Sequence, residues 1–570
     1  MLSLDAVPDQ VRSEIASALV SLVFLDGVLR DLGANPRRPP AFIGNSRISQ
    51  LAWGVDSMVA AARLLFCGQV AGAAAIARNQ VEVWTQARAL LSDTTKLVGE
   101  SESEFIARAW SRPLSAKRKR SANATLVFDW PDQQASAVEP DMDHRHVRLE
   151  GGSELCPAAI WGAQSELLHG REFSQASFWD ASCLDNEEFG DSGAAIELVL
   201  DGLRLSMFQI RAELRVLALD AGFSRSAQLL STPMDGFSEA GDEDPQGQVG
   251  VEQLRKPAGV VSPTLWFLAP LSPGEGLSTD AMKQMSEAAE AFELVLNGRR
   301  PAGRLYRDDE LVTVAFGWHR FRSAVTAQAA LDREALVLRD RSDLRFLSGR
   351  GTVWVLVSEA AALAGLWLPA GSRRDAICLA ASALRSSWWM WLEDDDRSMT
   401  MLRTVLEQVA RGRTWRRRPE KAGKLEKRST PRDWLEAAGW KRLGPLNAAV
   451  GGFAHLTAKS DWGSARSLLM ELQDAPDPQD APFTARRSAL ELVTSLLAME
   501  ICEQVRELSP SIGDELRVLF HEVGAFPDEV EKFIENRMNF IGGFRPAITS
   551  QSKQATESVQ ATISQTIDSW

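Results

Sequence analysis

Cysteine, histidine and tyrosine are scarce in this chain of 570 residues, which has five, six and one of them respectively. The cysteines lie far apart, and none forms a C-x-x-C pair. An odd number of scattered cysteines argues against a disulfide framework or a cysteine-rich zinc site and is typical of reduced thiols in a cytoplasmic protein. The residues are Cys67, Cys156, Cys183, Cys378 and Cys502.

Long apolar runs are also lacking. The most apolar window, residues 352–369, contains Ser358 and Glu359 and is barely long enough to cross a bilayer. The first residues carry neither the basic nor the apolar segment of a secretory leader. We therefore expect no membrane segment, a buried helix in this window and a cytoplasmic location. Abundant alanine and a preference for arginine over lysine indicate a bacterial, GC-rich genome.

Common catalytic motifs are missing: the sequence has no P-loop, no G-x-G-x-x-G after a predicted strand, no G-x-S-x-G and no H-E-x-x-H. It therefore predicts no cofactor and no metal. Helical ribonucleases of bacterial toxins and defence systems use arginine and histidine at a slightly longer spacing than Arg517 and His521. The segment DMDHRH places His144 and His146 on one face of an extended chain without a third ligand, and we interpret it as a solvated loop.

What remains is typical of an acidic globular protein. Hydrophobic residues make up 45% of the chain and charged residues 24%, with a net charge of −13. This excess of acid argues against indiscriminate coating of nucleic acid, which needs a basic face, but it permits a local basic groove.

Apolar residues recur at helical spacing, as in Leu402, Val405, Leu406 and Val409. The sequence predicts a mainly α protein of two related helical-bundle units with a small mixed α/β or irregular region between them. Short strands or buried segments are expected at residues 264–271 and 352–357. The predicted parts are a first unit (1–222), an acidic linker (223–263), an intermediate region (264–370), a second unit (371–548) and a loose tail (549–570).

Four landmarks recur in the same order in the two units, which indicates a duplication. They are an R-x-x-x-E helix, a basic loop, a segment ending in histidine (SELLHG and GGFAHL) and a helix beginning AIELV or ALELV. The last pair supports the duplication best. The register of the first pair stays open: Arg78 and Glu82 match Arg403 and Glu407, but residues 78–84 also match residues 385–391, and the spacing to later landmarks favours this second register.

The order R-x-x-x-E, then histidine near a small residue, resembles an uncharacterised all-helical bacterial domain family that is often met in mobile-element and phage-defence settings. The resemblance covers residues 48–214, with RNQVE and SELLHG, and residues 375–508, with RTVLE and GGFAH. The second copy has Gly451 where the first has Ser165, which argues against a shared hydroxyl role. The resemblance implies helical architecture and a bacterial setting, and it implies no particular reaction.

The two Arg/Glu pairs lie one helical turn apart beside apolar stripes. We favour an ion pair that orients helix packing; the alternative is a polar pocket in which arginine grips a phosphate or carboxylate. A half-buried pair needs a further partner, which His169 or His455 would supply. These histidines end helical segments, where they stabilise the helix dipole, and they are the first choice for acid–base chemistry if the chain is an enzyme. The candidate catalytic residues are His169, His455, Arg78, Arg403, Glu82 and Glu407.

Basic loops are expected at residues 112–120 and 411–432, either as sites for a polyanion or as solvated loops that offset the acidic body. Trp415 and Trp434 near the second loop have rings that can stack on bases, whereas residues 388–391, WWMW, are expected in the core. The candidate binding residues are Lys117, Arg118, Lys119, Arg120, Arg411, Arg413, Arg416, Arg417 and Arg418.

Three functions are consistent with these observations. The favoured one is a non-enzymatic binding or sensing component of a bacterial system, such as anti-phage defence, whose basic loops bind a polyanion or a partner. The second is a metal-independent nuclease or hydrolase centred on His169 or His455 with Arg78 or Arg403. The third is an oligomeric helical scaffold. We expect a protein partner or self-association, nucleic acid as a candidate partner of the basic loops, and no membrane.

Overall fold

The structure is a computed structural model, and the described part of the chain is mainly α-helical, which confirms the predicted fold class. The strands in this part are β1 (Val147–Arg148) and β2 (Glu154–Leu155), an antiparallel pair in which Val147 faces Leu155. None of the described helices combines the length and the apolar character needed to cross a bilayer. The described residues are 25, 29, 41–66, 69–91, 94–111, 147–148, 154–169, 193–220, 327, 329–336, 344–427, 429–454, 462–472, 482–527 and 529–544.

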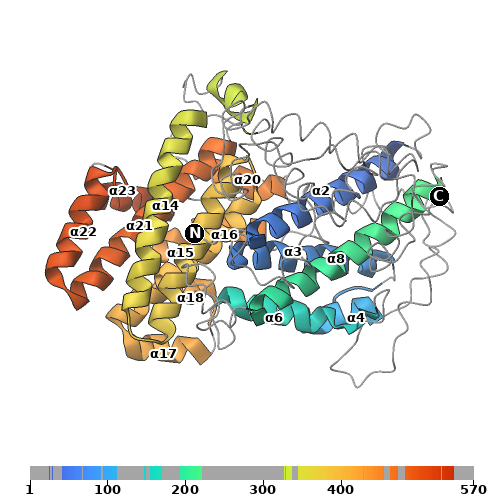
Figure 1. The fold of residues 1–570 in the computed structure, drawn as a ribbon, viewed down its shortest axis with the longest axis horizontal. Helices are drawn as coiled ribbons and strands as arrows, with labels where there is room; N and C mark the ends of the chain where they lie inside the picture. Colours follow the sequence, from blue (N-terminus) through green and yellow to red (C-terminus); the bar gives the residue numbers. More distant parts are fainter. Residues whose placement is uncertain are drawn as a thin grey trace, which may run out of the picture.

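In the N-terminal half, α3 is the central helix and packs against the other described helices of that half (Figure 1). Its sequence is rich in alanine, so neighbouring helices approach its backbone closely. Trp84 of α3 is fully buried and fills the space above Gly54 of α2, where a Cβ atom would lie 2.7 Å from the indole ring. The helices of this half are α2 (Ala41–Phe66), α3 (Val70–Leu91), α4 (Glu102–Ser111), α6 (Pro157–His169) and α8 (Gly193–Asp220).

In the C-terminal half, α15 and α16 pack along each other as a helical hairpin at the centre of a large hydrophobic core. As expected, residues 388–391 are buried there. The Trp391 ring lies edge-on to Trp354 at 5.2 Å and 4.7 Å from Phe483. The helices are α14 (Leu344–Trp367), α15 (Ser372–Leu392), α16 (Arg397–Arg417), α17 (Pro419–Lys427), α18 (Pro431–Ala437), η6 (Lys441–Leu443), α19 (Gly444–Ala454), α20 (Trp462–Glu471), α21 (Pro482–Leu508), α22 (Pro510–Glu522) and α23 (Val530–Gly543).

Two local predictions for this half are wrong. Residues 411–432 are largely helical, because α16 continues to Arg417 and the prolines Pro419 and Pro431 open α17 and α18. Proline is tolerated at the first position of a helix, where its missing N–H would have had no partner. Residues 352–357 belong to α14, which confirms the helix expected in the apolar window and contradicts the alternative of a strand there. The segment 264–271, the acidic linker and the tail lie outside the described residues, and the division into two duplicated units stays a prediction.

An acidic turn, defined here as Glu393–Asp396 between α15 and α16, joins the two halves. Glu393 pairs with Arg63 of α2, and both side chains are almost completely buried. Asp395 pairs with Arg397, whose guanidinium also reaches Asp56 of α2 at 2.5 Å. Within the C-terminal half, Asp394 and Asp396 pair with Arg486 of α21, and Asp396 also with Arg466 of α20. Through these ion pairs, the acidic turn and Arg397, the first residue of α16, are held to α2, α20 and α21.

A close helix contact completes this junction. Gly72 of α3 faces Ser386 of α15 so closely that a Cβ atom at position 72 would lie 2.5 Å from the Ser386 hydroxyl oxygen. The Ser386 hydroxyl donates a hydrogen bond of 2.8 Å to the side chain of Gln69. Figure 1 shows α3 running up to α15 and α16 at the middle of the molecule.

Gly72→Ala should destabilise the protein by about 1–3 kcal/mol, because the added methyl group overpacks this contact. The matched control is Gly162→Ala in α6, where no atom lies within 4 Å of the added Cβ. There the better helix propensity of alanine should stabilise the protein by about 0.5–1 kcal/mol. Urea unfolding measures both variants. Equal effects of the two substitutions would contradict the close packing of α3 on α15.

Candidate functional site

Arg78 and Glu82 lie on the face of α3 that looks toward the C-terminal half, and both side chains are buried. Arg78 Nη2 donates to Glu82 Oε1 at 3.2 Å, and the Trp161 indole N–H of α6 donates to the same oxygen at 2.8 Å. The Arg78 guanidinium also lies over the Trp161 ring, 5.3 Å from its centroid. Burial raises the pKa of Glu82, and Arg78 and Trp161 offset this only in part. The carboxylate of this first pair is therefore bonded within its own half.

The second pair, Arg403 and Glu407, lies on α16 and is completed by a residue of the other half. His169, the last residue of α6, places Nδ1 3.2 Å from Glu407 Oε1. Burial on its own would raise the pKa of Glu407, but the charges of His169, Arg403 and Arg411 and the His169 hydrogen bond lower it to about 2. Glu407 is therefore a carboxylate at neutral pH and can orient the imidazole ring. This contact is the histidine partner that the sequence required for a half-buried pair.

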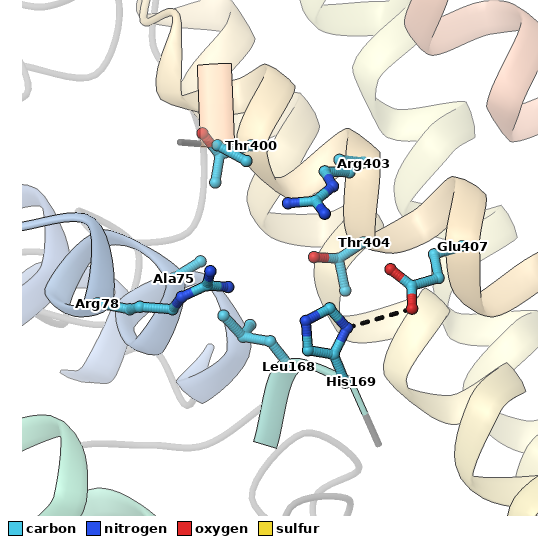
Figure 2. A pocket seen from close by; sticks show the side chains of 9 residues that line it. Ala75, Arg78, Leu168, His169, Thr400, Arg403, Thr404 and Glu407 are labelled. Atoms are coloured by element: carbon cyan, nitrogen blue, oxygen red, sulfur yellow. Dashed lines mark hydrogen bonds and ion pairs between the residues drawn. The ribbon is translucent and has the colours of Figure 1, made fainter. Parts of the chain in front are cut away.

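A pocket lies where the two pairs meet (Figure 2). The side chains of Arg78, His169 and Arg403 point into it from three different helices. Its cavity has a volume of about 20 Å³, which is enough for one water molecule, so a larger group can enter only if the side chains move. The side chain of His169 is 30% exposed, against 7% for Glu407, so solvent reaches the pocket beside the imidazole ring. The lining residues are Ala75, Arg78, Leu168, His169, Thr400, Arg403, Thr404, Glu407 and Ala454.

The two arginines influence each other across this pocket. Burial lowers the pKa of Arg403, Glu407 raises it, and the positive charge of Arg78 lowers it again. Like charges repel strongly where water is largely excluded. The Nε–H of Arg78 is buried and has no hydrogen-bond partner among the described residues. A group with negative charge and hydrogen-bond acceptors would reduce both costs.

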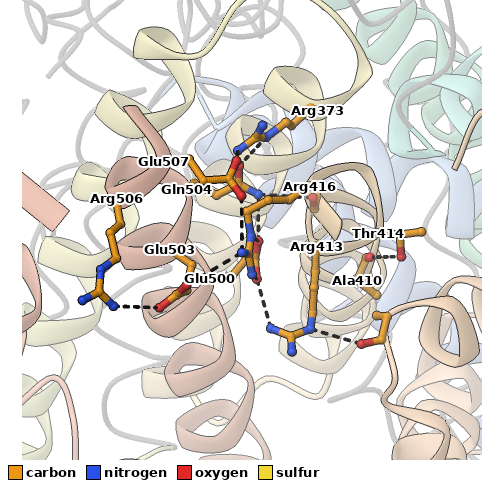
Figure 3. A network of polar contacts seen from close by, with 12 residues as sticks. Arg373, Ala410, Arg413, Thr414, Arg416, Glu500, Glu503, Gln504, Arg506 and Glu507 are labelled. Carbon is orange, nitrogen blue, oxygen red and sulfur yellow. Dashed lines mark hydrogen bonds and ion pairs between the residues drawn. The ribbon is translucent and has the colours of Figure 1, made fainter. Parts of the chain in front are cut away.

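Three of the arginines expected in the second basic loop, Arg411, Arg413 and Arg416, are engaged in ion pairs within the protein, whereas Arg417 and Arg418 are exposed. Arg411 pairs with Glu426 at 2.6 Å, and Arg413 and Arg416 both pair with the fully buried Glu500 of α21, at 3.2 and 2.6 Å (Figure 3). Arg418, just after α16, donates to a backbone carbonyl oxygen. Arg417 is the last residue of α16.

These ion pairs neutralise only part of the expected basic surface, because Arg417, Arg418, Lys421, Lys424, Lys427 and Arg432 are exposed. Lys117, Arg118, Lys119, Arg120 and His455 lie outside the described residues. So does the DMDHRH segment. Among the side chains that the structure describes, no group of three or more histidine, cysteine, aspartate or glutamate residues could hold a metal ion.

Two polar lining residues, Thr400 and Thr404, and the tryptophan that bonds Glu82, Trp161, were not anticipated from the sequence. Thr400 and Thr404 flank Arg403 on α16, and with Glu407 they occupy one helical face at spacings of three and four residues. That polar stripe at helical spacing, beside the apolar stripe of α16, was the available signal. Trp161 gave no such signal, because its role depends on α6 packing against α3.

Replacement of Glu407 should change how stability depends on pH. A carboxyl group whose pKa is lowered by folding stabilises the protein above its unfolded pKa, and this contribution disappears as pH falls toward the folded pKa. For Glu407 the window runs from the usual value of 4.5 down to about 2. Glu407→Gln should therefore flatten the loss of stability in that window. Denaturant unfolding at several pH values measures this, with Glu491→Gln on the partly exposed side of α21 as the control. An unchanged pH profile would show that Glu407 is not held as a buried carboxylate.

Comparison with known proteins assigns no role to the residues of this pocket. No protein-family model, curated protein or solved structure matches this chain. The chemistry available at the junction is accordingly that of its side chains: two facing arginines, a histidine–glutamate pair and two threonines.

Proposed function

We propose that this protein is a binding or sensing component whose pocket between α3, α6 and α16 holds an anionic group of a ligand. The observation that carries the proposal is the convergence of Arg78 and Arg403, from different halves, on one pocket. Guanidinium groups form strong charge-assisted hydrogen bonds with phosphate and carboxylate. The bacterial anti-phage setting suggested by the sequence resemblance belongs to the same proposal.

The charge balance of the site supports an anion over a cation. Glu82 is neutralised by Arg78 and bonded to Trp161, and Glu407 is bonded to His169. Both carboxylates are thus occupied by donors of the protein. Arg78 retains a buried donor without a partner among the described residues, and Thr404 adds a hydroxyl group to the lining. The pocket therefore offers mainly hydrogen-bond donors to a ligand.

Arg403→Gln should weaken the binding of a small anion by roughly tenfold or more, because a hydrogen bond to a charged group contributes about 1.5–3 kcal/mol. Inorganic phosphate and acetate titrated into the protein by calorimetry provide the measurement. The control is Arg204→Gln on α8, which removes the same charge far from the pocket, from a residue that pairs with Asp201. Binding that is equally strong in Arg403→Gln and wild type would refute the proposal.

A second candidate, a metal-independent hydrolase or nuclease, is favoured by the contact of His169 with Glu407. In such an enzyme His169 would accept a proton from the attacking hydroxyl group, Glu407 would orient the imidazole, and Arg78 and Arg403 would stabilise the charge that develops on phosphorus oxygens. His169 is the most suitable base because its ring is partly exposed.

For this second candidate, His169→Ala should abolish cleavage of RNA or DNA in the presence of EDTA while thermal unfolding stays cooperative. His521→Ala on the exposed side of α22 is the matched control and should keep full activity. No cleavage of any nucleic acid by the wild-type protein would reject the enzyme. A chain that neither binds an anion nor cleaves nucleic acid would instead fit the oligomeric scaffold.

A further inference from the structure

Six of the nine residues that line the pocket correspond in pairs between the two halves. Arg78 and Arg403 are 325 positions apart, and Ala75 and Thr400, which also line the pocket, have the same separation. Leu168 and Ala454 are 286 positions apart, which is the offset that aligns SELLHG with GGFAHL. Equivalent positions of two copies thus meet at one point.

The helix packing shows the same correspondence. In the N-terminal half α3 packs against α2, α6 and α8, and in the C-terminal half α16 packs against α15, α19 and α21. The helices α6 and α19 carry the two histidine-segment sequences, and α8 and α21 carry AIELV and ALELV. The helices α3 and α16 also contact each other directly. The contact between α3 and α16 thus joins corresponding helices of the two halves, and α3 packs in addition against α15.

This arrangement favours Arg403, and not Arg385, as the counterpart of Arg78. Arg385 lies on α15 and pairs with Glu359 of α14, away from the pocket. In the register that pairs Arg78 with Arg403, α15 corresponds to α2, and α16 to α3. The spacing of the sequence favoured the register that pairs residues 78–84 with 385–391. The packing favours instead the register that pairs Arg78 and Glu82 with Arg403 and Glu407.

The two copies differ in how their carboxylates are used. Glu82 is held by Trp161 of its own half, whereas Asn447 stands at the corresponding position in the other half. Glu407 bonds His169 across the junction. The groups that can donate hydrogen bonds into the pocket, on Arg78, His169 and Arg403, therefore come from three helices and point into it from different directions. A planar carboxylate matches one guanidinium side-on, while a phosphate group presents oxygens in several directions.

We propose that the junction is a composite site for a phosphate group, in which Arg78 and Arg403 occupy equivalent positions of the two halves and bind the same phosphate from opposite sides. This inference rests on the proposed anion-binding function and specifies its ligand class. It makes the pocket dependent on the association of both halves.

A double-mutant cycle with inorganic phosphate tests the inference. Arg78→Lys and Arg403→Lys keep the positive charges beside Glu82 and Glu407, so the fold should survive, and thermal unfolding checks this. Each variant should weaken phosphate binding by roughly tenfold, because lysine cannot reproduce the two-pronged contact of arginine. The double variant should bind more tightly than the product of the two losses predicts, because groups that share a ligand are not independent. Arg385→Lys is the matched control and should bind like wild type.

The failures are distinguishable. Acetate binding as tight as phosphate binding would refute the phosphate group and leave the anion-binding function intact. Losses that simply multiply, or an effect of only one arginine, would refute the composite site but again leave anion binding. A loss in Arg385→Lys equal to that in Arg403→Lys would refute the assigned register. If neither phosphate nor acetate binds to the wild-type protein, the inference and the proposed function fail together.

Discussion

The arrangement of this molecule depends on the ion pairs of the acidic turn, Glu393–Asp396. Each of its four carboxylates is met by arginine, and the partners come from both halves. Loss of one member of a buried ion pair typically costs about 3–5 kcal/mol, because the remaining charge stays buried without compensation. Since α16 begins directly after this turn, the same contacts determine where Arg403 and Glu407 lie relative to α3.

The junction combines a rigid frame with a polar centre. Gly72 and Ser386 bring the backbones of α3 and α15 close together, and Arg63 and Arg397 hold α2 to the acidic turn. At the centre of this frame, the buried Nε–H of Arg78 is costly unless an acceptor satisfies it, and the positive charges of Arg78 and Arg403 repel each other. Binding energy for a ligand can thus come from groups that the fold has already placed and partly desolvated.

Much of the fold was predictable from local patterns, because apolar residues at helical spacing mark the face of a helix that is buried. The stripe at Leu402, Val405, Leu406 and Val409 lies fully buried in α16, as its spacing predicts. Residues 411–432 were expected to form a loop but are largely helical. Proline and charged residues occur both in loops and in the first turn of a helix, so their presence does not distinguish the two. Local sequence gives no means of choosing between these two environments.

The site was predictable only in its parts. Arg78, Arg403, Glu407 and His169 were all identified as candidates from the sequence, and the structure brings them together. The pairing of His169 with Glu407 joins residues 238 positions apart and results from helix packing, which no local pattern encodes. Glu82 shows the complementary case, because its bond to Trp161 removes it from the pocket chemistry that its motif suggested.

The internal pairing of Arg413 and Arg416 with Glu500 also affects how fast a ligand can arrive. These arginines project little positive field, and the whole chain carries a net charge of −13. An approaching anion is therefore repelled over distances comparable to the Debye length. Moderate salt screens this repulsion, so the association rate should rise with ionic strength until salt anions compete for the arginines.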